Sequence, residues 1–310
     1  MVGSPLFQSL SEDLQEQAFL NPHLWTYLEG LDPETIGIPE FVPRLSKNLR
    51  GGSSNNFLYP VANRVFIHLY SSDGEARDHY IAIEPAVSVM KSGLMDEVDK
   101  RLIDYVGDLQ AIVGEDREKR EAVLSEILDK VCVTNGNKGK RSALKVTPHE
   151  LDELRYLMIR DKEGMGAIQP LVSDPYIEDV SCSGVGSVFV EHKIFGGLTA
   201  GITFDSTDEL DQFVIKLSEK IGRPVTVRNP IVDSTLPDGS RINIVYGDDV
   251  SKRGSNFTIR KFQATPFSIL DLVSSGTLSY EMVSYLSLML GAGMNTFVSG
   301  ETASGKTTML

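Results

Sequence analysis

Residues 294–307 read MNTFVSGETASGKT and are the most informative segment of the chain. Its second part, GETASGKT, fits the spacing G-x-x-x-x-G-K-S/T of the Walker A loop. Gly300 and Gly305 permit backbone conformations that a side chain would obstruct, so the loop N–H groups can turn inward around phosphate oxygens. The first part, 294–299, predicts the short buried strand that precedes such a loop, and a helix is expected from Lys306.

The residue types of this loop predict ATP and Mg²⁺ as ligands. Lys306 can reach the β- and γ-phosphates, and the Thr307 hydroxyl can ligate Mg²⁺. An ordinary glycine loop is the alternative. Hydrolysis also requires a second acidic residue for Mg²⁺ and a group that orients water, and we expect both beyond Leu310, so residues 1–310 alone are expected to be inactive. The predicted nucleotide contacts are Gly300, Glu301, Thr302, Ala303, Ser304, Gly305, Lys306, Thr307 and Thr308.

Two arginine-bearing stretches lie upstream, LPDGSRINI (236–244) and RGSNFTIRKF (253–262). Both read as strands, with LPDGSR as a turn, and the second places Arg260 on the face opposite Phe257 and Ile259. The planar guanidinium suits phosphate oxygens, so Arg241, Arg253 and Arg260 are candidate phosphate ligands. A surface salt bridge is the alternative for each of them.

The rest of the chain predicts an alternation of helices and strands. Residues 5–30 have helical periodicity with a break at Pro22, and 64–84 read as a hairpin with an Asp-Gly turn. Residues 31–60 read as a linker with a short helix inside it, and 134–142 as a basic solvated loop or docking patch. Further helices are expected at 91–130, 147–160, 207–221, 267–275 and 279–291, and strands within 177–204 and 225–262.

Composition limits the class of protein. The net charge of −13 argues against direct binding of nucleic acid, and no apolar run approaches the ~20 residues of a membrane span. The N-terminus lacks the basic and apolar regions of a signal peptide, so a cytoplasmic protein is expected. Cys132 and Cys182 are expected to be buried thiols. His68 and His79 are predicted to face each other across the hairpin in a structural role.

Several motifs together resemble the type II/type IV secretion ATPase superfamily, in particular its archaeal branch and the archaellum motor ATPase. They are IEDVSCSG (177–184), PIVDSTLPDGSRINI (230–244), RGSNFTIRKF (253–262) and VSGETASGKTT (298–308), with NPHLWTYLEGL (21–31), NFLYPVANRVFIHLY (56–70) and HYIAIEP (79–85) for the archaellum branch.

The resemblance implies an α/β architecture in four parts. These are a helical module and linker (1–60), the first part of an α+β N-terminal domain (61–145), its arginine-bearing part (146–265), and the first strand and P-loop of a truncated RecA-like core (266–310). It also implies a homo-hexameric ATPase on the cytoplasmic side of the membrane, with a polytopic platform protein and other filament-motor components as partners. Arg241 and Arg260, with Arg253 as a weaker candidate, would then reach the phosphates, and Arg241 and Arg260 would act in catalysis with Lys306.

Three other interpretations stay open. The chain could belong to an ATPase of the same superfamily that serves protein secretion or conjugation. It could be a different P-loop enzyme such as a small-molecule kinase, although such kinases usually place the loop near the N-terminus. It could also be a catalytically incomplete assembly module.

Overall fold

The computed structural model describes residues 3–32, 35–46, 49, 55–72, 74–86, 89, 93–111, 114–134, 143–262, 268–274, 276–301 and 305–309. The chain forms two compact units, Met1–Lys261 and Phe262–Leu310. Within the described residues, no helix is long and apolar enough to cross a membrane.

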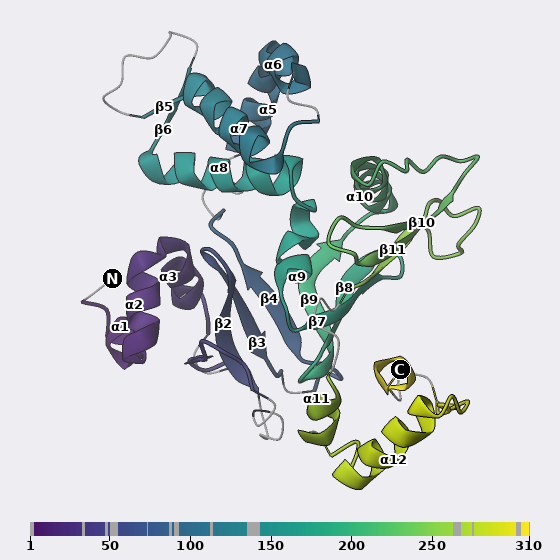
Figure 1. Cartoon of the computed structure of the whole chain (residues 1–310). Helices are drawn as coiled ribbons and strands as arrows, with labels where there is room; N and C mark the ends of the chain where they lie inside the picture. Colours follow the sequence, from purple (N-terminus) through teal and green to yellow (C-terminus); the bar gives the residue numbers. More distant parts are fainter. Residues whose placement is uncertain are drawn as a thin grey trace. The chain divides into compact units, whose positions relative to one another are not determined.

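One mixed sheet of ten strands runs through the first unit in the order β1-β2-β3-β4-β9-β8-β7-β12-β11-β10 (Figure 1). Neighbouring strands are antiparallel except at β1–β2 and β4–β9, which pair in parallel. The sheet draws strands from three of the four predicted parts, whose boundaries stay a prediction. Its strands are β1 (Glu40–Phe41), β2 (Asn56–Ala62), β3 (Val65–Tyr70), β4 (His79–Ile83), β7 (Ile177–Cys182), β8 (Gly186–His192), β9 (Gly196–Phe204), β10 (Ile231–Thr235), β11 (Arg241–Val245) and β12 (Asn256–Arg260).

The parallel seam between β4 and β9 contains two residue pairs, His79↔Thr199 and Tyr80↔Ala200. A buried carboxylate, Asp174, lies beside it after α9 (Gln169–Ser173). Its Oδ2 accepts hydrogen bonds from the hydroxyls of Tyr59 and Tyr80, both at 2.8 Å. Burial raises the pKa of Asp174, and these donors supply the partners that a buried carboxyl group requires.

Three short helices cover one side of strands β2 to β4 (Figure 1). They are α1 (Pro5–Ser9), α2 (Glu12–Leu20) and α3 (Pro22–Glu29), and they confirm the predicted helical segment with its break at Pro22. Leu14 and Leu24 pack in one apolar cluster with Leu58 and Phe66 of the sheet. The Tyr27 hydroxyl of α3 bonds to His68 Nδ1 of β3 at 2.7 Å, so a polar contact adds to this packing.

A second helical group lies between β4 and β7 in the sequence and has its own apolar core. Thr147 and Glu150 form a reciprocal capping box at the start of its last helix, as the Thr-Pro sequence predicts. Cys132 lies in this core, where burial raises its thiol pKa to about 11. The group comprises α5 (Leu94–Leu102), η2 (Ile103–Tyr105), α6 (Val106–Ala111), α7 (Arg117–Val131), β5 (Cys132–Thr134), β6 (Leu144–Val146) and α8 (Pro148–Lys162), and η3 (Gly166–Ile168) follows it.

The arginine-bearing strands are backed by helix α10 (Thr207–Lys220). Phe204, Phe213 and Phe257 from β9, α10 and β12 meet with ring centroids 5.1 to 6.4 Å apart. Cys182 is also buried there, so both cysteines are buried thiols as predicted. The second unit contains α11 (Ile269–Ser274), α12 (Tyr280–Gly291) and α13 (Lys306–Met309).

Three predictions need correction. Residues 31–60 contain strands β1 and most of β2, which pairs with β3 and extends the predicted hairpin. Residues 294–299 are irregular and form no strand, because no described segment of the second unit supplies a pairing partner. His68 is opposite Ile81, and Tyr70 lies between the two histidine rings, 4.9 Å from His68 and 4.8 Å from His79. Most of the basic loop, 135–142, lies outside the described residues.

Candidate nucleotide-binding site

A tight turn fixes the start of strand β11. Leu236 accepts a hydrogen bond from the Gly239 amide at 2.9 Å, and its own amide donates to the Ser240 carbonyl at 2.7 Å. Gly239 has φ +86°, a left-handed conformation that favours glycine. The Asp238 carboxylate accepts bonds from the amide and the hydroxyl of Ser240 at 3.0 and 2.8 Å. Arg241, the next residue, is thereby held at a defined register in the sheet.

The register brings the two predicted arginines together. Arg241 of β11 is the direct cross-strand partner of Arg260 of β12, so their Cβ atoms lie roughly 5 Å apart on one face. Both side chains are exposed, whereas Phe257 and Ile259 are buried on the other face, as the alternation predicts. We call Arg241 and Arg260 the arginine pair.

Like charges at directly opposed positions destabilise a sheet unless an anion balances them. Asp179 of β7 is the cross-strand partner of Arg260 on its other side, and its Oδ1 lies 3.1 Å from Arg260 Nε. Asp179 therefore pairs with Arg260, and the structure describes no ion pair for Arg241. The arrangement can accept a further multiply charged anion, for which a polyphosphate is suited.

The other basic residues of these strands lie elsewhere. Arg253 precedes β12, and the length of that strand, on the order of 13 Å, separates it from the arginine pair. Lys261 faces away, and its ammonium group donates to the backbone carbonyl of Asp174. Burial lowers the pKa of Lys261. The structure thus separates Arg241 and Arg260 from the weaker candidate Arg253.

The described part of the Walker A loop has a lysine directed at its own backbone. Lys306 Nζ donates to the Gly300 carbonyl at 2.9 Å and also to the carbonyl of Glu301. Gly305 has φ +82°, the left-handed conformation for which the sequence pattern requires glycine. An ammonium group turned into a glycine loop fits the phosphates of a nucleotide. Thr302, Ala303 and Ser304, and the side chains of Thr307 and Thr308, lie outside the described residues, so their roles stay predictions.

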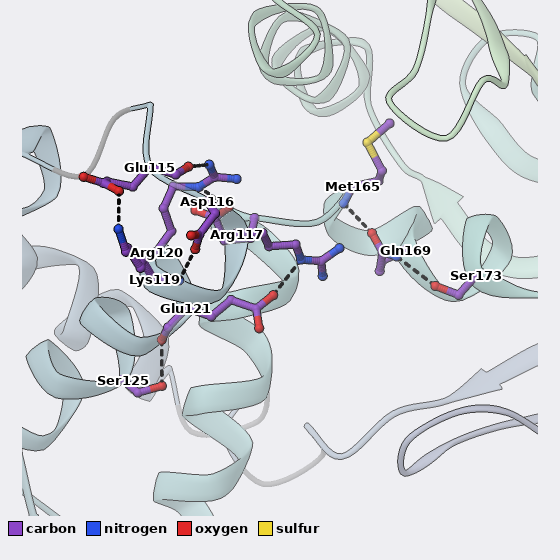
Figure 2. A network of polar contacts seen from close by, with 11 residues as sticks. Glu115, Asp116, Arg117, Lys119, Arg120, Glu121, Ser125, Met165, Gln169 and Ser173 are labelled. Carbon is purple, nitrogen blue, oxygen red and sulfur yellow. Dashed lines mark hydrogen bonds and ion pairs between the residues drawn. The ribbon is translucent and has the colours of Figure 1, made fainter.

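A second polar network lies on α7 and near α9, and Figure 2 shows it. Arg117 pairs with Glu121 at 2.7 Å, Lys119 pairs with Glu115 at 2.8 Å, and Asp116 caps the helix. Arg117 and Glu121 also line a cavity of about 350 Å³. Because these oppositely charged side chains pair with one another at the start of the helix, the network stabilises α7.

Sequence reasoning missed one member of the arginine site. Asp179 belongs to the IEDV stretch, which reads as an ordinary strand with polar residues on one face. Its contact with Arg260 spans 81 residues of sequence, so no local pattern indicates it. Across the described residues, no cluster of three or more His, Cys, Asp or Glu side chains could hold a metal ion.

Part of the chain is similar to known proteins. Residues 161–310, which include both the arginine pair and the Walker A loop, match the family model described as "Type II/IV secretion system protein". An uncharacterized protein of Methanocaldococcus jannaschii is 40% identical over 96% of this chain. The chain spans 56% of the length of that relative.

Two named proteins are more distant. The type IV secretion system protein VirB11 of Bartonella quintana is 26% identical over 34% of this chain and 38% of its own length. The crystal structure of the VirB11 ATPase from the Brucella suis type IV secretion system, in complex with sulphate, has a TM-score of 0.31 at 22% identity, covering 46% of this chain and 50% of that chain. On the family match, residues 161–310, just under half of the chain, are similar to the type II/IV secretion system proteins.

Proposed function

We propose that this chain is the ATP-binding N-terminal region of a hexameric ATPase that powers assembly or rotation of an archaeal type IV pilus-like filament, the archaellum. The observation that carries the ATPase part is the arginine pair, two arginines that strand register sets directly opposite each other. The family match covers this pair and the loop together. The archaeal source of the 40% identical relative supports the archaeal branch. The protein would work at the cytoplasmic face of the membrane, through a polytopic platform protein.

ATP would supply the phosphoanhydride bond whose hydrolysis releases free energy, and Mg²⁺ would bind its phosphates. In this proposal the loop amides and Lys306 bind the phosphates, and the Thr307 hydroxyl ligates Mg²⁺. Arg241 and Arg260 stabilise the charge that develops on the transferred phosphoryl group. Their planar, always-charged side chains suit that task better than lysine.

The surface of helix α12 supports a larger ATPase core around residues 266–310. None of its residues is buried, although its sequence, YEMVSYLSLMLG, is mostly apolar. Tyr280, Tyr285 and Leu288 are 72%, 62% and 70% exposed. A helix that is apolar on most sides is normally buried in a protein core. We therefore propose that further elements of a RecA-like fold cover it.

Removing either member of the arginine pair should reduce hydrolysis and mostly spare nucleotide binding. In the full-length protein, Arg241→Ala and Arg260→Ala should each lower the rate of phosphate release by about 10²-fold, since a charge-stabilising donor is lost. The affinity for a fluorescent ATP analogue should change by less than about 3-fold. Arg253→Ala is the matched control, because Arg253 lies at the opposite end of β12. This variant should hydrolyse ATP at the wild-type rate. Normal hydrolysis by both arginine-pair variants would show that the assignment is wrong.

A secretion role is the second candidate, because the matched family and the named sequence relative are described as secretion system proteins. The two roles predict different phenotypes when the gene is deleted. Deletion should abolish surface filaments and swimming if the archaellum role is right, and it should abolish export of a protein substrate with filaments intact if the secretion role is right.

A further inference from the structure

Asp179 is the acidic residue that, in the described part of the chain, forms an ion pair with the arginine pair. It lies in β7, directly across from Arg260, and Arg260 lies directly across from Arg241. Three charged side chains from three adjacent strands therefore form one row in the order Arg241, Arg260, Asp179. The strands fix this order, so the carboxylate is adjacent to Arg260 and one strand removed from Arg241.

The contact uses one edge of the guanidinium group. Asp179 Oδ1 accepts from Arg260 Nε at 3.1 Å. An arginine side chain has five N–H donors, and the bond at Nε leaves the two terminal nitrogens for another acceptor. The Arg260 side chain is 75% exposed and that of Asp179 is 34% exposed, so an anion can reach the terminal nitrogens while the ion pair persists.

The ion pair is poorly suited to a purely stabilising role. Exposed pairs of this kind contribute little to folding, because water screens the charges and two long side chains lose freedom. Arg260 also experiences repulsion from Arg241 across the strands, which would turn its flexible side chain away. A carboxylate on the opposite flank attracts the side chain in the same direction, so both forces hold Arg260 against Asp179 and restrict its rotamers.

We propose that Asp179 is a positioning residue, which holds the Arg260 guanidinium group in place for the phosphates of ATP. This inference rests on the proposed function of the arginine pair. Asp179 itself would contact no nucleotide and would exchange no proton with it. Its effect would pass through Arg260 alone, and this restriction makes the inference testable.

The first test is Asp179→Asn in the full-length protein, which removes the charge at nearly constant volume. We expect kcat for ATP hydrolysis to fall about 10-fold, while KM for ATP changes less than about 2-fold, because the interaction acts in the transition state. Asp179→Glu, which keeps the charge, should recover part of kcat. Glu178→Gln is the control, because it removes the same charge one residue away. The Glu178 side chain is exposed, and the structure describes no ion pair for it. This variant should hydrolyse ATP at the wild-type rate.

A double-mutant cycle then identifies the residue through which Asp179 acts. In an Arg260→Ala background, Asp179→Asn should cause no further loss, because its target is absent. In an Arg241→Ala background it should still cost about 10-fold. Equal losses in the two backgrounds, or a fall in thermal stability that parallels the fall in kcat, would overturn the positioning role.

The outcome also separates this inference from the proposed function. If the arginine-pair variants lose hydrolysis and Asp179→Asn does not, only the positioning role fails. If the arginine-pair variants hydrolyse ATP normally, both the proposed site and the role of Asp179 are wrong.

Discussion

Replacing Lys306 by alanine should reduce ATP turnover of the full-length protein by at least about 100-fold. The ammonium group of Lys306 is directed at the backbone of its own loop, with the Gly300 carbonyl at 2.9 Å, so the substitution removes the one side-chain cation described there. The loss of a preorganised charge of this kind costs on the order of 10² to 10³ in rate. Phosphate release at saturating ATP measures the effect.

The control for this variant is Lys252→Ala. Lys252 is an exposed residue in the loop between β11 and β12, outside the Walker A stretch. The Lys252→Ala variant should hydrolyse ATP at the wild-type rate. Undiminished turnover by the Lys306 variant would contradict the Walker A assignment, whatever the arginine variants show.

Acidification from pH 6.5 to 4 should strongly destabilise the first unit. Burial lowers the pKa of His23, His68 and His192 from 6.5 to about 4 in each case. The unfolded chain therefore takes up protons near pH 6.5 that the folded protein does not accept. The stability that these histidines provide is complete above pH 6.5 and is lost as the pH falls toward 4.

The bonds of His68 show why the folded protein resists the proton. Nε2 bonds to the Asn56 side-chain oxygen at 2.8 Å, and Nδ1 bonds to the Tyr27 hydroxyl at 2.7 Å. A neutral ring that donates at Nε2 and accepts at Nδ1 satisfies both partners, whereas an added proton removes the acceptor. A shift of this size corresponds to about 3 kcal/mol for each histidine. Asp174 partly offsets the loss, because burial raises its pKa and its protonation favours the folded state as the pH falls toward about 4.

Fluorescence of the single tryptophan measures this transition. Trp25 is buried in α3, the helix that also contains His23, and its ring packs against Phe7. The same helix contacts His68 of β3 through Tyr27. In urea titrations at several pH values, His68→Gln should lower the stability at pH 7.5. It should also reduce the slope of stability against pH, near pH 5, by about 1.4 kcal/mol per pH unit, which corresponds to one proton. An unchanged slope for His68→Gln would refute the explanation.

Local signals in the sequence predicted most helix starts correctly. Pro22 and the Thr147-Pro148 step act within one turn of chain, so each can be recognised without knowledge of the fold. The alternation around Phe257 and Ile259 likewise indicated the correct face for Arg260. Burial of one strand face imposes that pattern directly on the sequence.

Features that depend on distant strands could not be predicted in this way. Residues 56–62 form β2 although Pro60 suggests a loop, because pairing with β3 and packing beneath α1–α3 determine the outcome. The approach of Arg241 to Arg260 depends on the register of β11 and β12, and that of Asp179 on the pairing of β7 with β12. Residues 294–299 have the composition of a strand, but a strand requires a neighbour to form hydrogen bonds.

Under mechanical force, the first unit should separate first between strands β4 and β9. Two residue pairs join these strands, whereas five join β3 to β4 and six join β8 to β9. A force that separates the N-terminal strands from the C-terminal strands is therefore concentrated on this line. The hydrogen bonds from Tyr59 and Tyr80 to Asp174 add resistance there, and both end on one carboxylate oxygen. The resistance of the sheet along this line thus depends in part on a single buried side chain.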